Sequence, residues 1–198
     1  GRVAVIHNGI IENFSRLRSE LEGSGVAFAS ETDTEVVSHL VAAEVAAGSD
    51  LADAMRAVCR RLEGAFTLVA VHADVPDRVV AARRNSPLVV GLGDGENFLA
   101  SDVAAFIAHT REAMEIGEGQ VVEITPDGVT LTDFDGARVE EKRYHVTWDA
   151  SAAEKGGYDY FMLKEIAEQP QAAADTLLGR LTDDGRLMLD EMRLSDDD

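Results

Sequence analysis

The chain has 198 residues, 45% of them hydrophobic, and can bury the core of one large domain, or of one domain and part of another. A formal net charge of −19 argues against nucleic-acid binding, because such a field repels phosphate groups. No apolar stretch reaches the roughly 18 residues of a transmembrane helix, and the single cysteine excludes an internal disulfide. We therefore expect a cytoplasmic protein with neither a nucleic-acid nor a membrane partner.

Periodic apolar residues in the first third of the chain predict a strand followed by three helices. Asn13 is expected to cap the first helix, and Thr32 with Glu35 has the spacing of a capping box at the start of the second. An apolar run between these two helices reads as a further strand. The predicted elements are a strand over residues 3–6, helices over 14–22, 30–48 and 51–63, and a short strand over 26–29.

From residue 65 the apolar pattern alternates with a period of two, which indicates many short antiparallel strands. The pattern breaks over residues 147–158, whose small residues are typical of a linker. A helix is expected from Tyr160 to about Leu178, interrupted by Pro170. This order favours an α+β fold built of layers. The predicted strands cover residues 65–71, 78–83, 88–93, 97–101, 120–125, 128–134 and 137–144. Asp102 is expected to cap a short helix that runs through Ile107.

Asn8 and Gly9 end the first predicted strand, and two interpretations of them stay open. Asn-Gly is a common hairpin turn, although the segment that follows predicts a helix and not a return strand. Alternatively, the Asn8 side-chain N–H and the Gly9 backbone N–H could converge on one oxygen, as in an oxyanion hole. His7, beside them, is interpreted either as a base or as a satisfied histidine at the end of a strand.

Three acids, Glu31, Asp33 and Glu35, lie within five residues at the start of the second predicted helix. Asp33 reads either as a first-turn acid that the helix dipole favours or as a carboxylate that receives the ammonium group of a ligand. Cys59 lies beside an apolar helical stripe, so we predict that it is buried and inert rather than a nucleophile. The five histidines lack the spacing of metal ligands, and no metal site is predicted.

Five longer motifs occur in a fixed order along the chain: HNGIIEN at 7–13, SETDTE at 30–35, RNSPLVVGLG at 84–93, GENFLASD at 95–102 and KEIAEQP at 164–170. Together they resemble the glutaminase domain of the glucosamine-6-phosphate synthase family, the isomerizing glutamine–fructose-6-phosphate aminotransferases. The resemblance runs from about Val3 to Leu178. The KEIAEQP motif separates this family from other glutamine amidotransferases, which do not continue into a sugar-phosphate isomerase domain.

The resemblance implies a fold and a domain organisation. The fold would be α+β, a layered αββα sandwich like that of N-terminal-nucleophile hydrolases, present in part and followed by the helical start of a sugar-phosphate isomerase domain. Residues 1–146 would be the C-terminal part of a glutamine amidotransferase (glutaminase) domain and residues 147–158 a linker. Residues 159–198 would be the truncated beginning of the sugar isomerase domain.

The resemblance also implies a chemistry and partners. By position, Asn8 and Gly9 resemble the family's oxyanion hole, and Asp33 resembles the acid that binds the α-ammonium group of glutamine. In the family an N-terminal cysteine attacks the glutamine amide with its own α-amino group as base. The released ammonia passes through an internal channel to the isomerase domain, where fructose 6-phosphate becomes glucosamine 6-phosphate. The implied partners are glutamine, fructose 6-phosphate and a second copy of the chain, the last two through the isomerase domain; no cofactor is implied.

The 198 residues depart from the family pattern in two ways. The N-terminal cysteine has no counterpart here, since Gly1 cannot replace it, and neither does the arginine-containing segment that grips the glutamine carboxylate. We therefore expect an internal fragment that cannot hydrolyse glutamine alone. Two alternatives stay open: a nucleophile-free glutamine-binding or scaffolding module, and an amidotransferase that feeds another acceptor, such as an amidophosphoribosyltransferase, against which the KEIAEQP motif argues.

Overall fold

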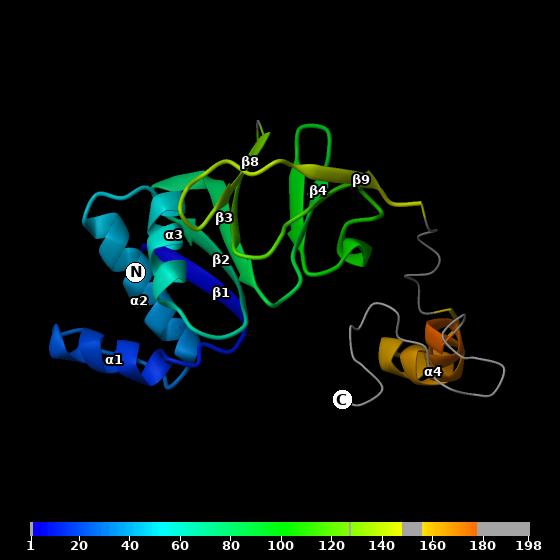
Figure 1. Cartoon of the computed structure of the whole chain (residues 1–198), viewed down its shortest axis with the longest axis horizontal. Helices are drawn as coiled ribbons and strands as arrows, with labels where there is room; N and C mark the ends of the chain where they lie inside the picture. Colours follow the sequence, from blue (N-terminus) through cyan, green and yellow to red (C-terminus); the bar gives the residue numbers. More distant parts are fainter. Residues whose placement is uncertain (1, 127, 148–155, 178–198) are drawn as a thin grey trace, which may run out of the picture. The chain divides into compact units, whose positions relative to one another are not determined.

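The computed structural model describes residues 2–126, 128–147 and 156–177, and the chain divides into two units, residues 1–147 and 148–198. Most of the predicted linker therefore lies outside the described residues. The helices of the first unit are α1 (Phe14–Gly23), α2 (Asp33–Ala46) and α3 (Leu51–Arg61), with a 3-10 turn, η1, at Val103–Ala105 (Figure 1). Its strands are β1 (Val3–Gly9), β2 (Phe66–His72), β3 (Val75–Arg84), β4 (Val89–Leu92), β5 (Asn97–Ala100), β6 (Glu112–Glu115), β7 (Gln120–Thr125), β8 (Gly128–Asp133) and β9 (Lys142–His145).

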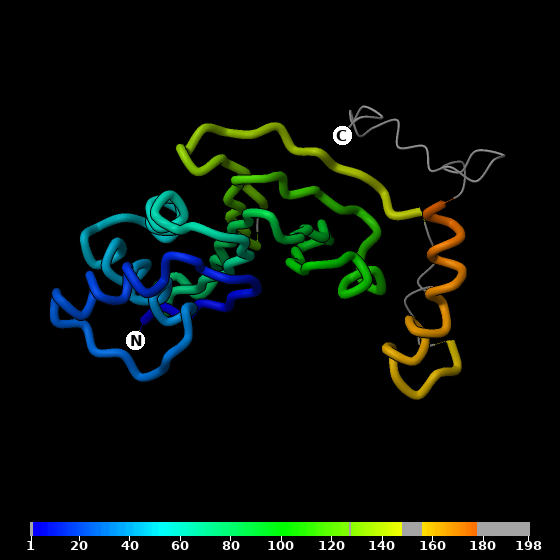
Figure 2. Tube along the Cα trace, turned by 60° about the horizontal axis from the view of Figure 1, so that its bottom comes forward, coloured from blue at the N-terminus to red at the C-terminus, as the bar shows by residue number. Residues whose placement is uncertain are grey.

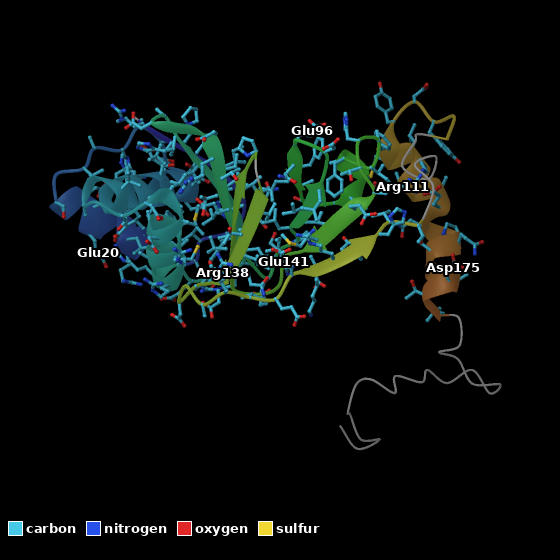
Figure 3. All side chains as sticks on the ribbon, turned by 90° about the horizontal axis from the view of Figure 1, so that it is seen from above. Glu20, Glu96, Arg111, Arg138, Glu141 and Asp175 are labelled. Carbon is cyan, nitrogen blue, oxygen red and sulfur yellow. The ribbon has the colours of Figure 1, made fainter. Side chains whose placement is uncertain are left out.

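The strands of the first unit form two antiparallel sheets. The five-stranded sheet has the order β1-β2-β3-β7-β8, and the four-stranded sheet has the order β5-β4-β6-β9. β1 therefore lies at an edge of the five-stranded sheet. The chain crosses between the sheets after β8, where Arg138 forms an isolated bridge with Thr132 before the chain continues past Glu141 into β9 (Figure 3).

Helices α1, α2 and α3 cover one face of the five-stranded sheet (Figures 1 and 2). Each helix contributes an apolar stripe because its apolar residues recur at three- and four-residue spacing. The largest buried cluster joins Leu17 of α1, Val37 of α2 and Met55 of α3 to strand residues such as Leu68 and Val80. Removal of this apolar surface from water is the main force that holds the helical layer on the sheet.

The opposite face of the five-stranded sheet packs against the four-stranded sheet. Adjacent residues of the central strands belong to different buried clusters. Val80 and Val121 face the helices. Ala81 and Val122 pack with Val90 and Met114 between the sheets. The middle of β3 and of β7 is thus buried on both faces, which explains why adjacent residues there are apolar, over 79–82 in β3 and 121–122 in β7. The first unit is a helix layer on a pair of antiparallel sheets, and the predicted layered α+β fold is confirmed.

The outer face of the four-stranded sheet carries η1. Asp102 Oδ1 accepts the Ala104 N–H at 2.7 Å and so caps this turn, as the sequence predicts. The buried Phe106 ring then packs on Gly91 of β4, where a side chain would collide with it.

In the second unit α4 (Phe161–Leu177) continues through Pro170, so the predicted interruption at that residue is wrong. Of the helices that the structure describes, none combines the length and apolar character that a membrane crossing requires.

Two further local predictions are wrong. Residues 26–29 are not a strand, because the N–H groups at both ends of this segment donate elsewhere: the Val26 N–H donates to Leu21 O, and the Ala29 N–H donates to the Glu35 carboxylate. Asn13 precedes α1 but forms no side-chain cap. Its Nδ2 donates to Arg61 O at 2.8 Å and its Oδ1 accepts the Glu63 N–H, which ties the start of α1 to the end of α3.

Candidate functional site

Asn8 lies within β1, so the hairpin-turn interpretation of Asn8 and Gly9 is wrong. Asn8 pairs with Thr67 of β2, and no return strand follows it. The Asn8 side chain is exposed and borders a cavity of about 210 Å³ between β1, β2 and residues of the four-stranded sheet. The residues that line this cavity are Ile6, Asn8, Thr67, Val69, Leu88, Leu99, Ala100 and Ser101. A small hollow that is largely apolar thus opens beside one side-chain amide.

Gly9 has a backbone conformation that only glycine adopts without strain. Its φ is +125°, and a Cβ built there would lie 2.1 Å from Ala65 O. The Ile10 N–H donates to Ala65 O at 2.8 Å, so residues 10 and 65 form a hydrogen-bonded pair of the ladder. Because such pairs alternate along antiparallel strands, the Gly9 N–H points away from β2, toward the free edge of β1. It is therefore oriented to donate to a group outside the ladder.

Asp33 begins α2, where Thr32 caps the helix by accepting the Glu35 N–H. The Asp33 side chain is 23% exposed. Its Oδ2 accepts the Ile11 backbone N–H at 2.9 Å, and its Oδ1 lies 3.6 Å from His7 Nδ1. The first turn of α2 is thereby fastened to the segment directly after Gly9. Half of the predicted capping box is confirmed, because Thr32 accepts the Glu35 N–H. The other half is wrong, because the Glu35 carboxylate accepts the Ala29 and Ser30 N–H groups.

His7 faces the helical layer and is nearly inaccessible, with 2% of its side chain exposed. Its Nδ1 lies 3.1 Å from Thr34 Oγ1, while its Nε2 has no hydrogen-bond partner among the described residues. Burial lowers the pKa of His7 below the ordinary value of 6.5, and the nearby Asp33 carboxylate opposes this shift in part. The expectation of a fully satisfied histidine is thus wrong for one of its two ring nitrogens.

The structure therefore brings Asp33, His7 and the segment after Gly9 together. Successive side chains of a strand point to opposite faces, so Asn8 lies on the face of β1 opposite His7. The contacts of Thr34 and of the Ile11 N–H with this group were missed at the level of sequence. The only available signal was the Thr-Asp-Thr run at the helix start, where a hydroxyl accompanies the acid.

Cys59 lies inside α3 and is completely buried, as predicted. Burial raises the pKa of its thiol to about 12, although Arg84 and Arg60 oppose the shift. A nucleophile must be a thiolate that the substrate can reach. The Cys59 thiol meets neither condition.

We expect that iodoacetamide at pH 8 leaves Cys59 unmodified in the folded chain, because the thiolate is the reactive form. The measurement is the intact mass after a reaction time that alkylates the urea-unfolded chain completely. The same folded chain should release no ammonia from glutamine. Rapid alkylation of folded protein would contradict the burial of this thiol.

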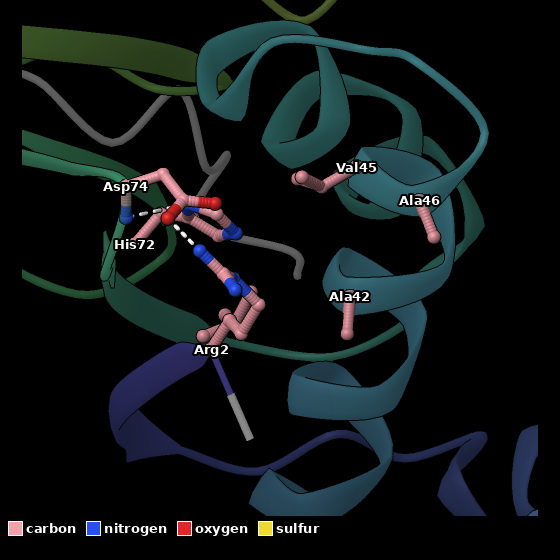
Figure 4. A pocket seen from close by; sticks show the side chains of 7 residues that line it. Arg2, Ala42, Val45, Ala46, His72 and Asp74 are labelled. Atoms are coloured by element: carbon pink, nitrogen blue, oxygen red, sulfur yellow. Dashed lines mark hydrogen bonds and ion pairs between the residues drawn. The ribbon is translucent and has the colours of Figure 1, made fainter.

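A second hollow, of about 340 Å³, lies at the opposite end of β1 (Figure 4). It is bordered by apolar residues of α2 and by Arg2, His72 and Asp74. The Arg2 guanidinium pairs with the Asp74 carboxylate, and the Asp74 N–H donates to His72 Nδ1 at 3.2 Å. Its charged groups thus pair with one another, and none of the predicted site residues borders it. Among the described residues, no three His, Cys, Asp or Glu side chains are grouped as a metal site requires.

Comparison with known proteins points to one enzyme class. The profile of the glutamine amidotransferase domain matches residues 1–108. The isomerizing glutamine–fructose-6-phosphate aminotransferase of Streptomyces coelicolor is 70% identical over 194 residues, which are 98% of this chain and 32% of the relative. The enzyme of the same name from Mycobacterium tuberculosis is 59% identical over 204 residues, covering 99% of this chain and 32% of the relative. The chain thus spans about a third of the length of these relatives.

Solved structures with the same arrangement of elements include two enzymes. The glutamine phosphoribosylpyrophosphate amidotransferase of Bacillus subtilis superposes with a TM-score of 0.58 at 24% identity, over 67% of this chain and 29% of that one. An allosteric regulatory enzyme of purine biosynthesis superposes with a TM-score of 0.56 at 25% identity, over 67% of this chain and 28% of that one. At such identities the likeness establishes the fold alone.

Proposed function

The chain belongs to the glutamine amidotransferase domain family, and from this premise we propose that it is part of an enzyme that transfers the amide nitrogen of glutamine to fructose 6-phosphate and forms glucosamine 6-phosphate. The observation that carries the proposal is the 70% identity over 98% of the chain with an enzyme of that name. The same observation disfavours the alternative of a nucleophile-free glutamine-binding or scaffolding module, because the identity extends over nearly every described element.

Asn8 and Gly9 stabilise the oxyanion of the reaction. When a thiolate attacks the amide carbon of glutamine, the carbonyl electron pair moves onto oxygen and a tetrahedral intermediate forms. The Asn8 side-chain amide and the Gly9 N–H are the two donors for this oxygen. The orientation of the Gly9 N–H away from β2 supports the role, because donors fixed before the reaction need no reorganisation as charge develops.

The attacking thiol comes from a part of the enzyme outside these 198 residues. Cys59 is buried with a raised pKa and cannot serve. The family resemblance supplies the candidate, an N-terminal cysteine whose own α-amino group takes the thiol proton. On this proposal the 198-residue chain alone is inactive as a glutaminase.

The remaining assignments follow the resemblance. Residues 1–146 belong to the glutaminase domain, residues 147–158 to a linker and residues 159–198 to the beginning of a sugar isomerase domain. The complete glutaminase domain completes the αββα sandwich, and the complete isomerase domain binds fructose 6-phosphate and forms the homodimer. The enzyme acts in the cytoplasm. Formation of glucosamine 6-phosphate from both substrates by the full-length protein tests the whole proposal, and glutamine binding without turnover would favour the binding-module alternative.

Asp33 binds the α-ammonium group of glutamine, and its replacement tests this role. We expect Asp33→Asn to raise the glutamine KM of the full-length protein about 10- to 100-fold, the loss of one hydrogen bond to a charged group. The asparagine still offers an oxygen to the Ile11 N–H, so the local fold survives. The exposed Glu31, two residues earlier, provides the matched control Glu31→Gln, whose KM should equal that of the wild type. An unchanged KM in Asp33→Asn would reject the assignment.

A further inference from the structure

The geometry points to His7 as a positioning residue for glutamine binding: an uncharged imidazole whose Nδ1–H donates to Thr34 Oγ1, whose hydroxyl in turn donates to the Asp33 carboxylate, so that the negative charge of Asp33 stays available to the ammonium group of the ligand. This inference rests on the proposed function, and it assigns a role to a residue that neither donates to the oxyanion nor attacks the substrate.

The contacts of His7 place it between β1 and the first turn of α2. Nδ1 lies 3.1 Å from Thr34 Oγ1 and 3.6 Å from Asp33 Oδ1, on the side of the carboxylate that the Ile11 N–H does not occupy. Asp33 thus has one oxygen held by the backbone after Gly9, while the other accepts the hydroxyl of Thr34 at 3.4 Å, and Thr34 is itself bonded to the imidazole. Two fixed neighbours on different elements define the direction of the carboxylate.

The surroundings of the ring favour one tautomer. Both oxygens near Nδ1 accept hydrogen bonds, and a carboxylate accepts only. A proton on Nδ1 therefore has partners, whereas Nε2 has none among the described residues. Because an unsatisfied N–H buried away from water is costly, the Nδ1–H tautomer with a bare Nε2 is the stable form of this ring.

The same surroundings keep His7 neutral near pH 7. Protonation would place an N–H on the buried Nε2, and burial lowers the pKa of His7 below 6.5 even though Asp33 raises it in part. In the part of the chain that the structure describes, Asp33 is the charged group that faces the ring. An imidazolium would compete with the ligand ammonium for this carboxylate. Glutamine binding should therefore weaken as the pH falls through the pKa of His7.

Two amide variants separate the two ring nitrogens, since Asn places its N–H near the position of Nδ1 and Gln near that of Nε2. In the full-length protein we expect His7→Gln to raise the glutamine KM about 10-fold with kcat changed less than about 2-fold, because the hydrogen bond to Thr34 that holds the Asp33 carboxylate in place is lost. His7→Asn should keep KM within about 3-fold of the wild type. The acidic rise in KM of the wild type should disappear in His7→Gln.

Coupling to Asp33 distinguishes positioning from a structural role. If His7 acts through Asp33, the variant with both His7→Gln and Asp33→Asn should have the KM of Asp33→Asn alone, because the two effects are not additive. Additive increases in KM, or a loss of kcat with unchanged KM, would overturn the inference. An unchanged KM in Asp33→Asn would instead reject the proposed role of Asp33 itself.

A spectroscopic measurement tests the tautomer without any activity. The full-length protein labelled with 15N-histidine should show the ring of His7, identified from its absence in His7→Gln, protonated on Nδ1 at pH 7.5. A ring protonated on Nε2 would overturn the inference even if the enzyme is fully active.

Discussion

Replacing Asn8 with alanine should lower the glutaminase kcat of the full-length protein about 100- to 1,000-fold, while the KM for glutamine changes little. The side-chain amide donates to an oxygen that carries full charge only in the tetrahedral intermediate, so its loss raises the barrier without weakening ground-state binding. The side chain is exposed beside the cavity of about 210 Å³, and truncation removes no buried contact. Steady-state release of ammonia from glutamine measures both constants.

Asn97 provides the matched control for this experiment. Its Nδ2 donates to Thr125 O at 3.2 Å, a hydrogen bond within the described fold and not toward a ligand. Asn97→Ala should lower stability slightly and leave kcat as in the wild type. If Asn8→Ala keeps kcat and raises KM instead, Asn8 contacts bound glutamine and is not an oxyanion donor.

The fold was predictable from the sequence wherever local signals and tertiary contacts agree. The buried stripes of α2 and α3 follow helical spacing, and Thr32 and Asp102 cap the elements that they precede. β6 (Glu112–Glu115) was missed because Glu-Ala-Met-Glu has no strand preference of its own. It is a strand only because β4 and β9 pair with it from both sides.

The candidate site was predictable in its residues but not in its contacts. Motifs brought attention to Asn8, Gly9 and Asp33, which lie up to 25 positions apart in the sequence, from 8 to 33. That Asp33 accepts the backbone N–H of Ile11 depends on how α2 approaches the end of β1, and backbone donors carry no residue-specific signal in a sequence. The partnership of His7 with Thr34 has the same origin.

The segment after β1 packs closely on residues 63–65 because each of the two segments carries a glycine at the contact. A Cβ on Gly9 would lie 2.1 Å from Ala65 O, and a Cβ on Gly64 would lie 2.3 Å from Ile10 O. Because neither glycine carries a Cβ, the two backbones pack directly on each other. The Ile10 N–H donates to Ala65 O at 2.8 Å, and the Glu12 N–H donates to Glu63 O at 2.9 Å. A donor held by such contacts is oriented before substrate arrives, which is the condition for strong oxyanion stabilisation.

Gly9→Ala should therefore abolish measurable glutaminase activity, a loss of about 1,000-fold or more, since both the donor and its position are disturbed. The new Cβ would also meet Phe66 Cα at 2.9 Å, and a φ of +125° strains any L-residue. The backbone of residues 8–10 must move, and the free energy of unfolding should fall by about 3 kcal/mol or more. Ammonia release and urea unfolding of the full-length protein measure the two effects.

Gly48→Ala separates backbone strain from collision. Gly48 has a similar φ of +106°, but nothing lies within 4 Å of the position of its Cβ. This variant should lose about 1–2 kcal/mol of stability from strain alone and keep full glutaminase activity. Suppose instead that Gly9→Ala is as stable and as active as Gly48→Ala. That result would show that the close packing of residues 9–12 on residues 63–65 does not orient the Gly9 donor. The oxyanion role would then depend on the Asn8 side chain alone.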